Sequence, residues 1–269
     1  MGIVLNQSLK NTIITYIGFA VGGVSTLFLF PPILGKTYYG LSNYILSCAN
    51  VIMPLFAIGM QNTLVKFYSQ CKTEKEENQF LSFTVLFPLF LCIPLILIGL
   101  FFYDEIAFFM TKKNPIVKDF IYLIPFTGLC MAYFEIFYAW ARVHMHSVFG
   151  NFIKEVGLRL FSVVGLLGIY FKLITAIDFI YLTAVIYFVA FLVTMLYAFK
   201  VKKPVFQFSI PHNVKAILEY TFYIILSGSV ANLLLDGDKI MLNQYMDIGN
   251  IAYYSVATYI ALVISVPSR

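Results

Sequence analysis

Long apolar segments separated by short polar ones make up almost the whole chain. Seven or eight of these segments reach the roughly 20 residues that a helix needs to cross the hydrocarbon core of a bilayer. Runs of about ten residues that alternate between polar and apolar, typical of membrane β-barrels, are absent from the sequence. The pattern therefore predicts an all-α polytopic membrane protein. We expect its helices near residues 11–34, 41–66, 79–103, 117–141, 155–172, 177–199, 216–244 and 251–269.

The composition agrees with this pattern. Hydrophobic residues make up 61% of the chain and charged residues 12%, and the mean hydropathy is +0.86, far from the usage of soluble domains. The formal net charge of +5 does not indicate nucleic-acid binding, because the basic residues lie between apolar spans. The cysteines form neither a disulfide framework nor a CxxC motif. His144 and His146 lack a third ligand nearby, so we expect no metal and no cofactor.

The basic residues also indicate an orientation. Cytoplasmic loops of membrane proteins carry an excess of Lys and Arg. If the spans alternate, 12 of the 18 basic residues lie on the side of the N-terminus, which we therefore predict to be cytoplasmic. These are Lys10, Lys66, Lys72, Lys75, Arg142, Lys154, Arg159, Lys200, Lys202, Lys203, Lys215 and Arg269, whereas Lys36, Lys112, Lys113, Lys118, Lys172 and Lys239 lie on the other side.

Two distant stretches read almost alike: residues 38–44 (YYGLSNY) and 253–259 (YYSVATY). Such internal repeats are typical of two-lobed transporters. An even number of predicted spans separates the two copies, so both enter the membrane in the same direction and form parallel repeats. We expect a first lobe of six helices over residues 1–203, a cytoplasmic linker over 204–215, and the first two helices of an incomplete second lobe over 216–269, in a truncated chain or a fragment.

A line of polar residues follows the second predicted helix. At about 100° per residue, Asn43, Ser47, Asn50 and Gln61 fall within roughly 60° of one another, and Pro54 lies on the same line. A polar side chain in hydrocarbon is costly unless it meets water or a partner. The stripe therefore favours a water-filled cavity between the lobes. Hydrogen bonding to a neighbouring helix is the alternative.

The seventh predicted helix carries a similar stripe with charges, about 80° wide. Asp236 and Lys239 lie near its outer end, either as a pair facing the cavity with a role in substrate or ion handling or as a salt bridge at the rim. Asp238 points to the opposite side of the helix, toward neighbouring structure or the outer loop. The stripe consists of Ser229, Asn232, Asp236, Lys239 and Asn243.

Glu135 interrupts the fourth predicted helix near its cytoplasmic end. An unpaired buried carboxylate is unfavourable, so we expect a partner among Arg142, Lys154 and Arg159. These three cations form a basic cluster at the inner mouth, with Glu155 spaced to pair with Arg159. A diphosphate headgroup would be attracted there, as would anionic lipids.

Three stretches carry a family resemblance. The first apolar segment ends in residues 30–35 (FPPILG) and is followed by Tyr38, Tyr39 and Gly40. Residues 59–68 (GMQNTLVKFY) form the second stretch, and residues 235–242 (LDGDKIML) with 252–257 (AYYSVA) form the third. In these places the chain resembles bacterial polysaccharide flippases of the multidrug/oligosaccharidyl-lipid/polysaccharide exporter superfamily, over essentially its whole length.

The resemblance implies a function. Such proteins are not enzymes; they move undecaprenyl-diphosphate-linked oligosaccharides across the bacterial inner membrane by alternating access, for lipopolysaccharide O-antigen or other surface polysaccharide, alongside polymerase machinery. Here Lys66, Arg142, Arg159 and Lys239 would neutralise the diphosphate. Asn43, Ser47, Asn50, Gln61 and Asn232 would line the passage, and Asp236 or, second, Glu135 would couple transport to an ion.

Other functions stay open on the sequence. A cation-coupled multidrug exporter of the same fold would need a carboxylate in the first lobe, yet the first two predicted helices hold no Asp or Glu. A membrane glycosyltransferase or polymerase would need a large outer loop, and the largest here spans only residues 104–118. A scaffolding fragment is the remaining alternative.

Overall fold

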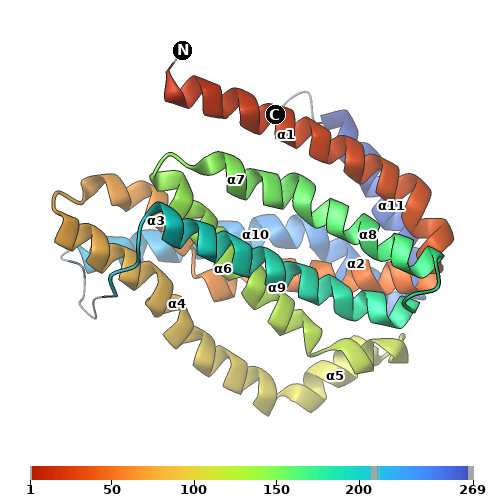
Figure 1. Ribbon diagram of the computed structural model, residues 1–269. Coiled ribbons are helices and arrows are strands. Elements are labelled where there is room, and N and C mark those ends of the chain that lie inside the picture. The colour runs from red at the N-terminus through yellow and green to blue at the C-terminus, as the bar shows by residue number, and fades with distance from the viewer. Residues whose placement is uncertain (1, 207–210, 212, 266–269) are drawn as a thin grey trace.

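The computed structural model describes residues 2–206, 211 and 213–265, which form one bundle of helices (Figure 1). No strand occurs among these residues, which confirms the predicted all-α fold. Within the described ranges, five helical stretches are long and apolar enough to cross a membrane, so this is a multi-pass membrane protein. The segments are α1 (Ile3–Val24), η1 (Ser25–Leu29), α2 (Phe30–Ala57), α3 (Met60–Phe67), η2 (Tyr68–Gln70), α4 (Glu74–Phe101), α5 (Tyr103–Thr111), η3 (Pro115–Phe120), α6 (Leu123–Val143), α7 (Ser147–Phe152), η4 (Ile153–Gly157), α8 (Leu158–Tyr170), α9 (Ala176–Val201), α10 (Val214–Tyr245) and α11 (Gly249–Ser265).

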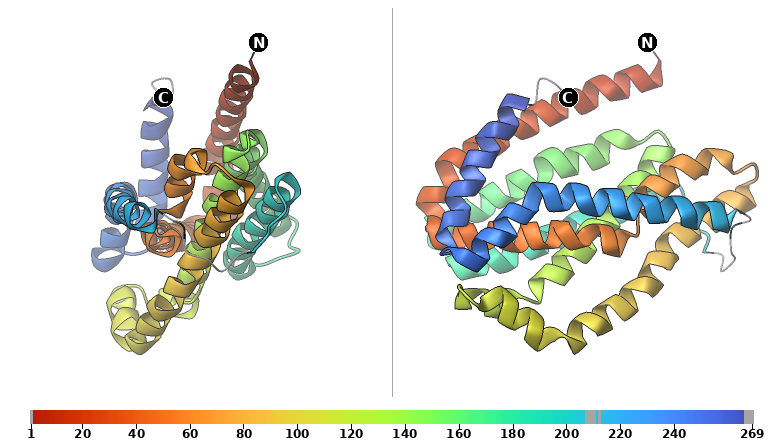
Figure 2. Two further views of the ribbon diagram at one scale, coloured as in Figure 1. Left: turned by 90° about the vertical axis from the view of Figure 1, so that its left-hand side faces the viewer. Right: turned by 180° about the vertical axis from the view of Figure 1, so that it is seen from behind.

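The way the helices join explains why this number is lower than the predicted seven or eight. The first stretch, Leu5–Ala57, contains the first predicted helix and most of the second. Gly35 interrupts it with φ 73° and ψ 160°, a conformation open to glycine because it has no Cβ. The chain turns back there, and Figures 1 and 2 show α1 and α2 running in opposite directions. In the predicted helix at 155–172, the first residues belong to the π-helical turn η4, and α8 then covers only 13 residues. The last helix, α11, is described over 17 residues.

The prediction of one unbroken helix over residues 41–66 is wrong at one point. The helix stops at Ala57 and resumes at Met60, because Ile58 and Gly59 are left-handed with φ values of 49° and 62°. Left-handed residues, most often glycine, commonly end helices by satisfying the last carbonyl groups while redirecting the chain. The Ile58 amide still donates to the Pro54 carbonyl at 2.9 Å. Gln61 and Lys66 therefore lie on the separate helix α3.

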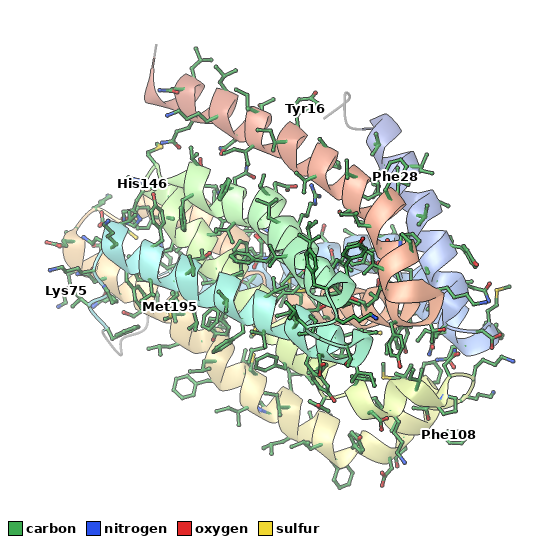
Figure 3. The ribbon with its side chains drawn as sticks, turned by 45° about the vertical axis from the view of Figure 1, so that its right-hand side comes forward. Tyr16, Phe28, Lys75, Phe108, His146 and Met195 are labelled. Carbon is green, nitrogen blue, oxygen red and sulfur yellow. The ribbon has the colours of Figure 1, made fainter. Side chains whose placement is uncertain are left out.

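The connection between the third and fourth predicted helices is also more ordered than expected. Residues predicted as a loop, 104–118, lie mostly in α5 (Tyr103–Thr111) and the short helix η3 (Pro115–Phe120), and α6 begins only at Leu123. Apolar rings project outward from this region and from η1: Phe108 and Phe28 are 75% and 68% exposed (Figure 3). In a membrane protein such exposed apolar surface faces lipid tails, which are themselves apolar.

α6 is the central helix of the bundle. It packs against α2, α3 and α9, and its Trp140 is buried against the rings of Phe137 and Phe199. We call the end of the bundle that holds the start of α1 the N-terminal end (Figure 1). The links Lys202–Glu74, at 3.2 Å, and Gln7 to the Met145 carbonyl join segments at this end. The loops with most of the predicted cytoplasmic cations therefore lie together.

The two copies of the repeat occupy related places. α1 and α10 run in the same direction, and each is followed by a reversal at the end opposite the N-terminus (Figures 1 and 2). α2 and α11, which carry the repeated residues, pack against each other. They approach so closely that a Cβ on Gly40 would lie 2.0 Å from the Ile248 carbonyl oxygen. This arrangement agrees with parallel repeats, while the division into two lobes stays a prediction.

Candidate functional site

The two predicted polar stripes face each other where α2 packs against α10. Asp236 of α10 accepts hydrogen bonds from the Ser47 hydroxyl at 2.8 Å and the Asn50 amide at 3.1 Å. The ammonium group of Lys239 lies 2.9 Å from the same carboxylate. Asn232 donates to the Asn50 carbonyl oxygen at 2.7 Å. We call these five residues the Asp236 cluster.

Pro54 explains why the Asn50 carbonyl can accept this bond. In a helix that carbonyl would receive the amide hydrogen of the residue four positions later, and proline has none. An unpaired carbonyl buried in a membrane protein is costly. Asn232 supplies the missing donor from the neighbouring helix. Pro54, Asn50 and Asn232 therefore act together to join α2 to α10.

The Asp236 carboxylate is deeply buried, with only 8% of the residue exposed. A buried charge is tolerated when an opposite charge and hydrogen-bond donors surround it. Here Lys239 supplies the charge, and Ser47 and Asn50 supply neutral donors. The structure thus contains the interhelical hydrogen bonding that the sequence left open as the alternative. A water-filled passage between these helices stays a prediction.

Three other predicted site residues, two from this stripe and one predicted cation, lie outside the Asp236 cluster. The Asn43 amide bonds to the Tyr39 carbonyl of its own helix at 2.9 Å. The Gln61 side-chain oxygen is buried and has no hydrogen-bond partner among the described residues. The Lys66 ammonium group lies 3.7 Å from the centre of the Tyr220 ring, a cation–π contact between α3 and α10.

The predicted basic cluster is largely neutralised. Lys154 lies 2.5 Å from the Glu135 carboxylate, which confirms one of the expected partners. Arg159 pairs with Glu155 at 3.5 Å, as the spacing predicts. Arg142 has no ion pair in the described part of the chain, and its guanidinium lies 5.7 Å from the centre of the Tyr138 ring. Of the three predicted cations, Arg142 is therefore the one without an ion pair among the described residues.

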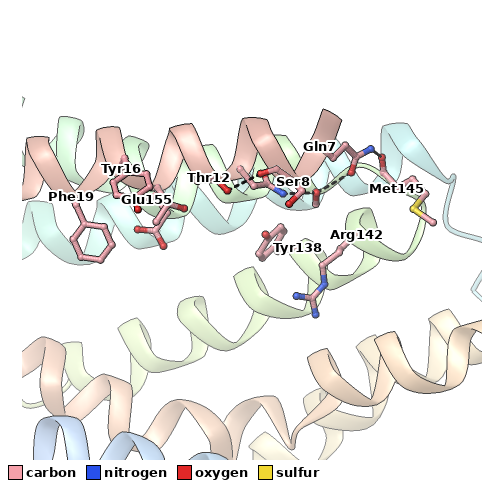
Figure 4. A pocket seen from close by; sticks show the side chains of 12 residues that line it. Gln7, Ser8, Thr12, Tyr16, Phe19, Tyr138, Arg142, Met145 and Glu155 are labelled. Carbon is pink, nitrogen blue, oxygen red and sulfur yellow. Dashed lines mark hydrogen bonds between the residues drawn. The ribbon is translucent and has the colours of Figure 1, made fainter. Parts of the chain in front are cut away.

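Arg142 borders a pocket of about 580 Å³ between α1, α6 and the α7–η4 segment (Figure 4). We call it the α1–α6 pocket. Sequence reasoning missed it, although the spacing of five polar residues on α1 was a signal that could have revealed it. The lining residues are Gln7, Ser8, Asn11, Thr12, Thr15, Tyr16, Phe19, Tyr138, Arg142, Met145, Ser147 and Glu155.

Asn114 is another feature that the sequence analysis did not single out. Its buried side-chain amide lies 3.0 Å from both oxygens of Asn243 and 2.9 Å from the Met246 carbonyl, and its oxygen accepts from the Ile248 amide at 2.9 Å. Asn243 in turn donates to the Met110 carbonyl at 2.8 Å. This network ties the connector after α5 to the turn between α10 and α11. No motif in the sequence marks it.

His144 and His146, which the sequence analysis considered as metal ligands, take part in side-chain packing. His144 lies 2.9 Å from the Tyr68 hydroxyl and 2.7 Å from the Trp140 carbonyl, and His146 lies 3.3 Å from the Tyr197 hydroxyl. Burial and the nearby Glu77 carboxylate raise the pKa of Tyr68, so its hydroxyl stays protonated at neutral pH. Within the described residues, no group of three or more His, Cys, Asp or Glu side chains could hold a metal ion.

Comparison with protein families identifies the family to which the chain belongs. The family described as polysaccharide biosynthesis protein matches residues 8–267, nearly the full length, and the chain belongs to that family. This finding confirms the resemblance noted at residues 30–40, 59–68 and 235–257. No curated protein and no solved structure matches the chain.

Proposed function

We propose that this protein is a flippase that moves polyprenyl-diphosphate-linked oligosaccharide, with undecaprenyl as the lipid, across the bacterial inner membrane during synthesis of surface polysaccharide. Membership of the polysaccharide biosynthesis family over residues 8–267 carries this proposal. The substrate of such a transporter has a large polar head and a long apolar tail. Helices that expose apolar surface to lipid, together with polar groups held inside the bundle, suit both parts.

The Asp236 cluster is the proposed moving contact between the two predicted lobes. Its hydrogen bonds link α2 of the first lobe to α10 of the second. In alternating access these lobes rock against each other, and the cluster would open to water as they part. The Asp236 carboxylate binds the Lys239 ammonium group and two neutral donors. Protonation of the carboxylate would remove its negative charge and so release Lys239. Asp236 is therefore the first candidate for ion coupling, and Glu135, paired with Lys154, is the second.

Basic side chains would bind the diphosphate of the substrate during its passage. Arg142, without an ion pair among the described side chains, is the best placed to bind it, while Lys66, Arg159 and Lys239 first have to leave their present contacts. The gathering of basic loops at the N-terminal end supports a cytoplasmic N-terminus, since cytoplasmic loops are enriched in Lys and Arg. The oligosaccharide would enter from that side, and polymerase machinery would use it on the other.

A flipping assay tests the proposal. The full-length protein is placed in liposomes with fluorescently labelled polyprenyl-diphosphate-linked oligosaccharide extracted from the host of the protein, and a membrane-impermeant quencher reports the outer-leaflet fraction. We expect the wild-type protein to accelerate flipping. Asp236→Asn should lower the initial rate about tenfold or more, which corresponds to about 1.4 kcal/mol of barrier.

Asp238→Asn is the matched control, because Asp238 bonds to Tyr254 and takes no part in the Asp236 cluster. Its rate should stay within about twofold of wild type, or about 0.4 kcal/mol. Equal flipping with and without the wild-type protein would contradict the flippase assignment. Transport of a cationic dye in place of the oligosaccharide would favour a multidrug exporter.

A further inference from the structure

The N-terminal half of α1 has two unlike faces. Leu5, Leu9 and Ile13 are each at least half exposed, as lipid-facing side chains are. The other face carries five polar residues at positions i, i+1, i+4, i+5 and i+8, a spacing that puts them on one side of a helix. This polar face forms one wall of the α1–α6 pocket (Figure 4): Gln7, Ser8, Asn11, Thr12 and Thr15.

Part of this wall is already used to hold α1 in place. Asn11 donates to the Ser147 hydroxyl at 2.9 Å, and that hydroxyl donates to Gln7 at 3.0 Å. Other groups are left over. The side-chain oxygen of Asn11 is buried without a partner, and Thr15 makes no hydrogen bond within the described part of the chain. The pocket thus contains hydrogen-bonding groups that the protein itself does not satisfy, as binding sites do.

Aromatic rings complete the pocket. Tyr138 of α6 points toward α1 in Figure 4, and Tyr16 and Phe19 come from α1 itself. A sugar ring has an apolar face of C–H groups and an edge of hydroxyls. Aromatic faces suit the first and hydroxyl or amide groups suit the second. The volume of about 580 Å³ lies within the range of small-molecule sites, roughly 300–1,000 Å³.

The charges agree with a sugar that carries one phosphate-bearing end. Glu155 is paired with Arg159, so the pocket has one cation without an ion pair among its described neighbours, Arg142. A fully neutral pocket would not favour an anionic linkage, and a strongly basic one would bind any anionic lipid. One arginine beside neutral polar groups favours a neutral glycan with a single anionic attachment point.

We propose that the α1–α6 pocket is a glycan-recognition site that selects the oligosaccharide before it reaches the Asp236 cluster. Thr15 and Asn11 hydrogen-bond to sugar hydroxyls, Tyr138 stacks on a sugar ring, and Arg142 contacts the adjoining phosphate. This inference rests on the proposed function, because it assigns the sugar-reading part of the same transport path. The site is separate from the Asp236 cluster and shares no residue with it.

Cysteine protection tests the site without relying on transport. Thr15→Cys is made in the full-length protein with Cys71→Ser, since Cys48, Cys92 and Cys130 are buried. The probe is the oligosaccharide lipid extracted from the host, compared with sugar-free polyprenyl diphosphate, and the readout is the rate of labelling by a water-soluble thiol reagent. The sugar-bearing probe should slow labelling about tenfold and the sugar-free probe less than twofold. Asn6→Cys, exposed on α1 outside the pocket, should be unaffected.

Measuring the flipping kinetics of pocket variants distinguishes a failure of this inference from a failure of the proposed function. Tyr138→Leu should raise the KM for flipping about tenfold while leaving kcat within about twofold, with Tyr170→Leu at an exposed site as the matched control. If the wild-type protein flips the lipid but both probes protect Thr15→Cys equally, or neither does, the glycan site is wrong and the flippase assignment stands. If the wild-type protein flips nothing, the proposed function itself fails.

Discussion

The Asp236 cluster and the α1–α6 pocket are built from the same kinds of residue, yet they differ in what remains free. In the cluster, Ser47, Asn50 and Asn232 all bond across the contact between α2 and α10. In the pocket, Asn11 keeps an unpartnered oxygen and Arg142 lacks an ion pair among the described residues. Polar stripes of similar appearance therefore join helices in one place and leave groups open to a ligand in the other.

The difference lies in the neighbouring helix. α10 brings a carboxylate, an amide and an ammonium group to meet the α2 stripe. α6 brings Tyr138 and Arg142 to the α1 stripe and leaves a space between them. A polar stripe on a membrane helix is thus ambiguous until its partner is known. We expect changes in the cluster to lower stability and changes in the pocket to spare it.

The largest effect should follow Asp236→Ala. Removing the carboxylate leaves Lys239, whose side chain is only 16% exposed, without its counter-charge; breaking a buried pair in this way typically costs about 3–5 kcal/mol. Thermal unfolding of the full-length protein in detergent, followed by the loss of monodisperse protein on size exclusion, should show a clear drop in Tm. Asp236→Leu combined with Lys239→Leu removes both charges and should recover most of the loss. A double variant as unstable as the single one would contradict the pairing.

A smaller effect should follow Asn114→Ala, at the second paired network. The substitution removes a buried side chain that bonds to Asn243, Met246 and Ile248, so about 1–3 kcal/mol of stability should be lost. Asn250→Ala is the control, because the only side-chain hydrogen bond of Asn250 among the described residues is to the Asp247 carbonyl in its own turn. It should change stability by less than about 0.5 kcal/mol. Equal Tm values for the two variants would show that the Asn114 network does not stabilise the bundle.

The smallest change in stability should follow Thr15→Val in the pocket. The hydroxyl has no hydrogen bond within the described structure, and valine has nearly the same shape, so unfolding should shift by less than about 0.5 kcal/mol. The same thermal assay measures this. Thr111→Val is the comparison, since its hydroxyl bonds to the Ala107 carbonyl of its own helix at 2.7 Å. A loss above about 1 kcal/mol at Thr15 would mean that the pocket wall is structural.

Sequence reasoning located much of the candidate site. The helical periodicity placed Ser47 and Asn50 on one face of their helix and Asn232, Asp236 and Lys239 on one face of theirs, and the structure brings these two faces together. The i, i+4 pairing of Glu155 with Arg159 and the choice of Lys154 as one partner for Glu135 were also within reach. Each of these inferences depended only on spacing along one helix or on charge.

Other features were beyond that reasoning. The break at Ile58 and Gly59 moved Gln61 and Lys66 onto a separate helix, which the apolar pattern did not reveal. Asn114 lay in a segment predicted as a loop, and its partners come from the last turn of α10 and the turn that follows it, more than a hundred residues later in the chain. Local pattern carries no information on such distant pairings.

The sequence by itself determined that this is a helical membrane protein with polar stripes on its helices, because hydropathy and helical period act along the chain. The tertiary structure decided which stripe is paired and which is left open, because that depends on the groups that a second helix brings within hydrogen-bond distance. Pro54 illustrates both contributions. The sequence shows that this residue has no amide hydrogen to donate, but only the packing of α10 brings Asn232 to the Asn50 carbonyl in its place.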